Sequence, residues 1–114
     1  MRENVIQEKS RAFAVRIVRC YKFLGKEKHE FIMSKQLLRC GTSIGANIVE
    51  SRNAQSRPDF VSKLNIALKE ADETRYWLGL LYSSDYLDKD SFNSLDKDCN
   101  ELISLLVTII KKMK

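Results

Sequence analysis

Apolar side chains recur at alternating steps of three and four residues along four long stretches of this 114-residue chain, and this spacing restricts the fold more than any other feature. An α-helix places such positions on one face, whereas a half-buried strand would need an apolar residue at every second position. The first stretch predicts a helix from about Glu3 to Gly25, with one face formed by Ile6, Ser10, Phe13, Ile17, Cys20 and Leu24.

Helix start and stop signals delimit three further helices. A second is predicted from about Glu30 to Asn53. Ser56 followed by Pro58 and Asp59 is a strong helix start, so the third begins there and ends near Ser83–Asp85. The fourth begins around Asp88–Ser91 and continues to the basic C-terminus.

The fold class follows from these four segments and their short connections. Four Gly and one Pro are too few for an architecture of many short strands and turns. Short connections force neighbouring helices to run antiparallel. The sequence therefore predicts an all-α, antiparallel up-down-up-down four-helix bundle, with residues 1–114 as a single domain.

Two glycines in the second segment indicate close packing. Phe31, Leu38, Gly41, Gly45, Ile48 and Val49 lie broadly on one side of the predicted helix. Each glycine costs about 1 kcal/mol relative to Ala in a helix interior. The prediction is that a neighbouring backbone approaches at Gly41 and Gly45; the alternative is a local irregularity at Gly41.

No constellation of residues points to catalysis, a metal or a cofactor. The single histidine, His29, lies in the first connection and lacks the Glu-x-x-His context of di-iron bundles. Cys20, Cys40 and Cys99 form no CxxC pair, which favours reduced thiols in a cytoplasmic protein. The N-terminus lacks the apolar run of a signal peptide, and the longest apolar stretch, 102–110, is too short to span a membrane. We therefore predict a non-enzymatic protein without a membrane partner.

A row of polar residues runs along the second helix. Arg39, Ser43, Asn47 and Glu50, called the polar row below, fall within a sector of about 80°. Ser and Asn are mediocre helix formers, so they favour a packed polar seam in which Arg39 pairs with Glu50 or with acids of the third helix, such as Glu73. A contact site for a ligand or partner and a plain solvated face are the alternatives.

A row of cations runs along the first helix. Arg11, Arg19, Lys22 and Lys26, called the basic row below, also fall within about 80° of one another. Such a row is typical of phosphate binding, and the net charge of +5 is compatible with it. No aromatic residues interleave with the row, so it predicts no reading of base sequence. A solvated lysine-rich face is the alternative.

The third helix carries a second set of apolar residues. Ile66, Trp77 and Leu80, called the apolar strip below, lie off its main apolar face. Such a strip predicts an oligomer interface, because a monomeric bundle offers it nothing to pack against. The alternative is a thick core around a helix buried on two sides.

Two runs of sequence carry a family resemblance. QLLRCGTSIGANIVE at residues 36–50 and DFVSKLNIALKEADETRYWL at residues 59–78 resemble signatures of the four-helix-bundle family of 23S rRNA intervening-sequence proteins, also called the S23 ribosomal protein family. The matching positions include Arg39, Ser43, Asn47, Glu50 and Glu73.

The resemblance implies a left-handed up-and-down bundle that assembles as a homopentamer. Some members are encoded within insertions in bacterial 23S rRNA genes. A related group, the accessory variability proteins of diversity-generating retroelements, binds a reverse transcriptase and nucleic acid through a basic surface. The expected function is thus an oligomeric accessory protein that binds RNA, a ribonucleoprotein or a nucleic-acid enzyme; the alternative is a protein–protein scaffold.

Overall fold

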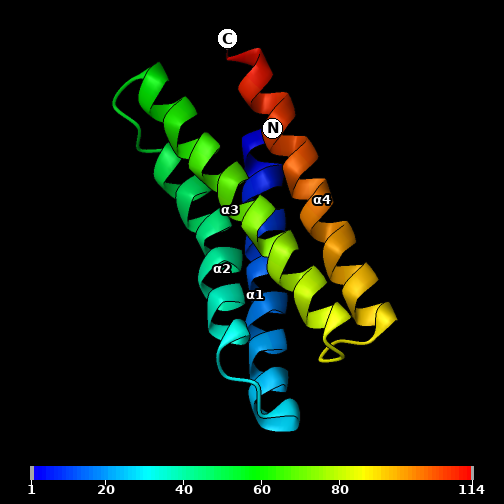
Figure 1. Ribbon diagram of the computed structural model, residues 1–114. Helices are drawn as coiled ribbons and strands as arrows, with labels where there is room; N and C mark the ends of the chain where they lie inside the picture. The colour runs from blue at the N-terminus through cyan, green and yellow to red at the C-terminus, as the bar shows by residue number, and fades with distance from the viewer. Residues whose placement is uncertain (1, 114) are drawn as a thin grey trace.

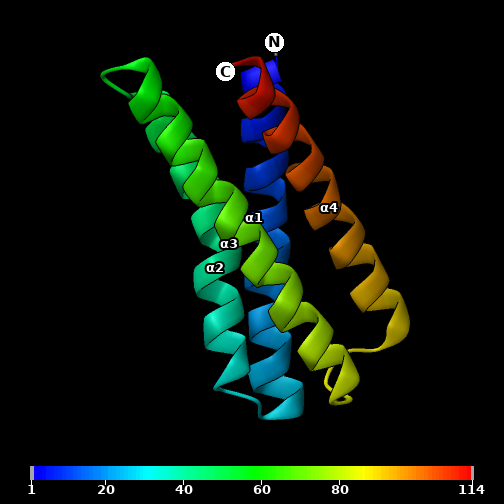
Figure 2. The ribbon, with the colours of Figure 1, turned by 45° about the horizontal axis from the view of Figure 1, so that its top comes forward.

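Four helices make up the computed structural model, which describes residues 2–113, and the side chains from residue 5 onward. They are α1 (Arg2–Lys28), α2 (Met33–Ser51), α3 (Arg57–Ser83) and α4 (Lys89–Lys112). Each runs antiparallel to the one before it, and the start of α1 and the end of α4 lie at the same end of an elongated bundle (Figures 1 and 2). Residues 2–113 contain no strand, so the predicted all-α four-helix bundle is confirmed.

The predicted helix starts at Ser56 and Asp88 are both capped by side chains. Ser56 Oγ accepts a hydrogen bond from the Asp59 N–H at 3.2 Å, and Asp88 Oδ1 accepts one from the Ser91 N–H at 2.7 Å. These oxygens satisfy first-turn donors that have no partner within the helix. Asp59 also accepts from the Gln55 N–H, which is a reciprocal capping arrangement shifted by one residue.

The start of α2 differs from the prediction. Glu30 was expected to open this helix, but α2 begins three residues later, at Met33. The buried Glu30 carboxylate instead accepts hydrogen bonds from the backbone N–H groups of Ile32, Met33 and Ser34, at 3.2, 3.0 and 2.7 Å. Glu30 therefore serves as the cap of α2, and His29 before it takes a left-handed backbone conformation with φ of 53°.

One continuous core fills the bundle, and it contains every residue of the predicted α1 face except the equally buried Ser10. The buried face of α2 was predicted only in part: Gly41 and Ile48 are buried as predicted, but Phe31 and Val49 are exposed and Leu38 is half-buried. Because α2 packs against both α1 and α3, its buried face is centred between these neighbours. That face consists of Ser34, Leu37, Cys40, Gly41, Ile44, Ile48 and Ser51.

The two α2 glycines both face α1, but the predicted approach of a neighbouring backbone is found only at Gly45, since Gly41 faces the side chain of Ile17. A Cβ at Gly41 would lie 2.8 Å from Ile17 Cγ1, and one at Gly45 would lie 3.6 Å from the backbone carbonyl carbon of Ser10. Real Cβ atoms do not approach other atoms as closely as the first of these distances. The missing side chain at Gly41 therefore sets how closely α2 approaches α1.

The seam between α1 and α4 is the least extensive of the four helix contacts and is bridged by polar side chains. Arg16 donates to Asp98 at 2.6 Å and to Ser94 Oγ at 2.9 Å, and Lys9 pairs with Glu101 at 3.0 Å. Toward the α3–α4 connection, α4 diverges from α1 (Figures 1 and 2). This divergence leaves one end of the seam open.

Candidate nucleic-acid interface

The basic row lies on the outer surface of α1. The side chains of Arg11, Arg19, Lys22 and Lys26 are all exposed. None of the four forms an ion pair within residues 5–113. Lys26 follows Arg11 by fifteen positions, which corresponds to about 22 Å along the helix axis. The row is therefore a cationic face whose four charges form no ion pair with an acid among the described side chains.

Tertiary structure adds a cation to this face and places an acid beside it. Arg52, just after α2, donates a hydrogen bond to Gln7 Oε1 at 2.6 Å and lines a shallow hollow together with Glu8 and Arg11. Sequence reasoning missed Arg52, because only the antiparallel packing of α2 on α1 brings residue 52 beside residue 7. Glu8 lowers the positive potential at this end, so the most basic part of the face runs from Arg11 toward Lys26.

Arg16 is the one arginine of α1's interior turns that points away from this face. It lies at the edge of the apolar face, beside Ile17 and three to four residues from Phe13 and Cys20. Its guanidinium is engaged by Asp98 and Ser94 of α4. Its sequence position at the edge of the buried face is the signal that could have identified it as an interhelical bridge.

The polar row divides between two structural roles. Arg39 donates to Glu73 and, at 3.3 Å, to Glu70, so it joins α2 to the acids of α3. Glu50 instead accepts from Lys63 at 3.0 Å. Both ends of the row therefore bridge α2 to α3.

The two residues in the middle of the polar row form hydrogen bonds with the backbone of α2 itself. Ser43 Oγ donates to the Arg39 carbonyl at 2.7 Å, and Asn47 Nδ2 donates to the Ser43 carbonyl at 2.8 Å. These bonds satisfy the side chains without any partner on α3. Ser43 and Asn47 are both half-buried.

Glu73 also connects the polar row with the apolar strip. It accepts a hydrogen bond from Trp77 Nε1 at 3.1 Å in addition to its contact with Arg39. The indole ring meets Tyr76 edge to face, with ring centroids 5.1 Å apart. The orientation of Trp77 is thus fixed by one hydrogen bond and one aromatic contact.

The three residues of the apolar strip are not equally exposed. Ile66 is 38% exposed and lines an open groove near Met113 at the end of α4. Trp77 and Leu80 are half-buried, and Trp77 packs partly against the core. The neighbouring Tyr76, which sequence reasoning did not single out, is 61% exposed. The outward aromatic surface of α3 is therefore formed by Tyr76 and Trp77 together.

Two negative findings concern the described part of the chain. Residues 2–113 contain no cluster of three or more His, Cys, Asp or Glu residues that could bind a metal ion. No helix within the same residues has the length and apolar character needed to cross a membrane.

Comparison with known proteins identifies the family. The sequence profile of the 23S rRNA-intervening sequence protein family matches residues 2–108. No curated protein matches the chain. A crystal structure of a protein of unknown function from the S23 ribosomal protein family of Bacteroides thetaiotaomicron is 58% identical, with a TM-score of 0.96 over 97% of this chain and 99% of that one. This chain therefore belongs to the family of 23S rRNA-intervening sequence proteins.

Proposed function

We propose that this protein is a non-enzymatic, oligomeric accessory protein of the cytoplasm that binds RNA, alone or within a ribonucleoprotein or a nucleic-acid enzyme complex. The observation that supports this function best is the basic row: Arg11, Arg19, Lys22 and Lys26 are exposed together on α1 and form no ion pair within the described side chains. The family name adds an association with ribosomal RNA genes.

The row is suited to phosphate contacts rather than to base reading. Four cations over about 22 Å span several phosphates of an RNA strand, and each contact releases condensed counterions. Ala12 and Val15 are the exposed residues between Arg11 and Arg19, and neither side chain offers a hydrogen bond to a base. Binding is therefore expected to depend strongly on salt and weakly on sequence.

Fluorescence anisotropy with labelled RNA tests this proposal. A 20-nucleotide single strand and a duplex of the same length are titrated with the protein at several salt concentrations. With four phosphate contacts to a single strand, the slope of log K against log salt should be about −3. Reversing the four cations of the basic row to Glu should abolish binding while circular dichroism stays helical.

A matched variant separates the row from overall charge. Lys35, Lys69, Lys89 and Lys97 are exposed and outside the basic row, so changing these four to Glu alters net charge equally. This control should retain most of the binding. Equal losses of RNA affinity in the two variants would show that binding depends on net charge rather than on the basic row. Unchanged binding by the row variant would show that the row does not bind RNA. An absorbance ratio typical of bound nucleic acid in the purified wild type would be consistent with the proposal.

A protein–protein scaffold is the second candidate function. It is supported by the exposed part of the apolar strip, where Ile66 and the Tyr76–Trp77 pair face outward on α3. Burial of this surface against further copies of the chain would produce an oligomer, and the family resemblance makes five copies the expected number. In this function the basic row would serve solubility, and RNA would not bind even at low salt.

A further inference from the structure

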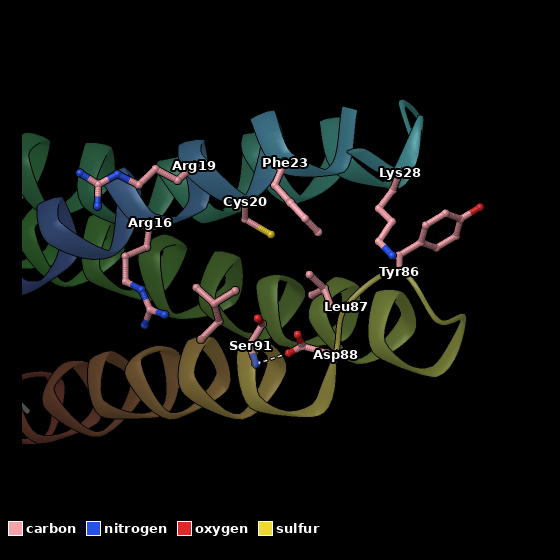
Figure 3. Close-up of a pocket in the computed structure, with 10 residues that line it drawn as sticks. Arg16, Arg19, Cys20, Phe23, Lys28, Tyr86, Leu87, Asp88 and Ser91 are labelled. Carbon is pink, nitrogen blue, oxygen red and sulfur yellow. Dashed lines mark hydrogen bonds between the residues drawn. The ribbon is translucent and has the colours of Figure 1, made fainter. Parts of the chain in front are cut away.

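A cavity of about 410 Å³ opens between α1 and the start of α4, at the end of the bundle where these helices diverge (Figure 3). Its volume falls within the range of small-molecule sites. Phe23 and Cys20 extend from α1 toward Leu87 of the α3–α4 connection, and Leu95 of α4 completes the apolar wall. Phe23 remains 42% exposed, so this wall is not fully covered by the chain itself.

The α3–α4 connection that forms one side of the cavity has a defined backbone conformation. Asp85 has a left-handed φ of 69°, and the N–H groups of Asp85 and Tyr86 return to the carbonyls of Tyr82 and Leu81 at 3.1 and 2.8 Å. This pair of bonds is a Schellman motif, which terminates α3 and fixes the direction of the chain that follows. Leu87 is thereby buried at 6% exposure against the core. The cavity is therefore built by the fold rather than by a loose loop.

Cations lie at both ends of this apolar wall. Arg16 and Arg19 are at one end and Lys28 is at the other (Figure 3). Arg16 is already paired with Asp98, but Arg19 and Lys28 are exposed and form no ion pair within residues 5–113. The lining thus offers two uncommitted positive charges.

Asp88 is the one acid among the lining residues. Its carboxylate accepts a hydrogen bond from the Ser91 N–H at 2.7 Å and stands at the positive N-terminal end of α4. That hydrogen bond, together with the nearby Lys28, lowers the pKa of Asp88. The negative charge of Asp88 therefore interacts with the N-terminus of α4. The remaining charged residues of the lining are cations, so the cavity favours an anion.

The spacing of the cations indicates the shape of that anion. Residues 19 and 28 are nine positions apart on α1, which is about 14 Å along the axis, and the apolar wall lies between them. We propose that this cavity binds an elongated amphipathic carboxylate, such as a medium-chain fatty acid anion, with its chain along Cys20, Phe23, Leu87 and Leu95 and its carboxylate at Arg19 or Lys28. This ligand site adds to the proposed RNA-binding function and shares one residue, Arg19, with the basic row.

Cys20 is compatible with an apolar chain beside it. Burial raises the pKa of its thiol to about 11, although the charge of Arg16 opposes the shift. The thiol is therefore neutral at physiological pH, and it contributes a small apolar surface to the cavity. The same thiol also provides a chemical reporter, since it is 8% exposed whereas Cys40 and Cys99 are fully buried.

Isothermal titration calorimetry with two probes of equal chain length tests the proposal. Decanoate and decylammonium, both below their micellar range, are titrated into the wild-type protein. One decanoate per subunit should bind, and decylammonium should bind at least tenfold more weakly because the cavity carries free cations. Equal binding of the two probes, or no saturable binding of decanoate, would overturn the proposal.

A variant that fills the cavity provides the second test. Ser91 is an exposed lining residue whose backbone N–H donates to Asp88, so Ser91→Trp adds bulk and keeps the donor of that capping bond. Decanoate binding should fall at least tenfold in Ser91→Trp, whereas RNA binding should be unchanged. Retained decanoate binding in a folded Ser91→Trp protein would place the ligand elsewhere and refute this site.

Charge reversal decides the question independently of Ser91. The double variant Arg19→Glu/Lys28→Glu should bind decanoate about fivefold more weakly or worse, since one exposed ion pair contributes up to about fivefold and the introduced carboxylates also repel the ligand. Lys89→Glu/Lys97→Glu changes net charge equally at exposed positions outside the lining and should leave binding within about twofold. Equal effects of the two double variants would contradict a site at the cavity.

Alkylation of the cysteines locates the ligand. Decanoate should slow the modification of Cys20 by iodoacetamide, followed by mass spectrometry, more than it slows that of Cys40 or Cys99. Global stabilisation by a ligand bound elsewhere would slow all three thiols together. Unchanged reactivity of Cys20 at saturating decanoate would exclude the cavity.

Discussion

The Cβ that Gly41 of α2 lacks would lie 2.8 Å from Cγ1 and 2.9 Å from Cγ2 of Ile17 on α1. Ile17 is fully buried, and its branched side chain has few alternative rotamers. The contact therefore cannot be relieved by a small side-chain rotation. It makes Gly41 a determinant of the distance between the first two helices.

We expect Gly41→Ala to lower the free energy of unfolding by about 1–3 kcal/mol, because overpacking outweighs the roughly 1 kcal/mol gain in helix propensity. Gly79 on α3 is the matched control, since a Cβ there would meet nothing within 4 Å. Gly79→Ala should be neutral or stabilising. Urea unfolding of the two variants measures both effects, and stabilisation by both would show that the Gly41 contact relaxes freely.

Glu30 is expected to make stability sensitive to acid. Burial opposes its ionisation, but hydrogen bonds from the N–H groups of Met33, Ser34 and Ile32 outweigh burial and lower the pKa of the carboxyl. A lowered folded-state pKa adds stability that is present above the unfolded value of about 4.3 and is lost as pH falls through the folded value.

Glu30→Gln should therefore reduce stability at pH 7 by about 1–2 kcal/mol, the usual contribution of a helix cap. The difference from wild type should disappear at low pH, where the wild-type carboxyl is protonated. Glu27→Gln, at an exposed position of α1, serves as the control and should have little effect at either pH. Urea unfolding at pH 7 and near pH 3 measures the stability of each variant. If Glu30→Gln remains less stable than the wild type in acid, the difference comes from the shape of the side chain rather than from its charge.

The pairing of Arg39 with Glu73 is expected to contribute modestly. The two side chains are 51% and 37% exposed, so a double-mutant cycle with alanine should give a coupling energy of at most about 1 kcal/mol. This coupling should shrink in high salt. If each single alanine variant instead weakens assembly or partner binding while leaving unfolding unchanged, the pair serves recognition rather than the bundle.

Trp77 is expected to anchor self-assembly. Trp77→Ala should shift the protein toward monomer while most of the helicity persists, because the indole lies at the outward surface of α3 beside Tyr76. Multi-angle light scattering at micromolar concentration measures the change. Tyr82→Ala, which removes another exposed aromatic of α3, is the control and should retain the wild-type mass. A monomeric wild type would refute assembly, whereas an unchanged mass of Trp77→Ala would refute only the anchor.

The four helices and the cap of α3 could be predicted from the sequence, because both depend on residues close together along the chain. The three-four spacing of Phe13, Ile17 and Cys20 places them on one face whatever α1 packs against. The cap at Ser56 needs only Asp59, three residues away. The basic row could also be predicted from the sequence, since one helix carries all four of its cations.

Contacts between helices depended on the tertiary structure. Spacing could not decide whether Arg39 would pair with Glu50 on its own helix or with acids of α3, because that choice depends on the rotation of α2 between its two neighbours. The same rotation buried Leu37 and exposed Val49. The cavity beside Cys20 arises from the divergence of α4 from α1, a relationship between residues more than sixty positions apart, and local sequence patterns carry no information about it.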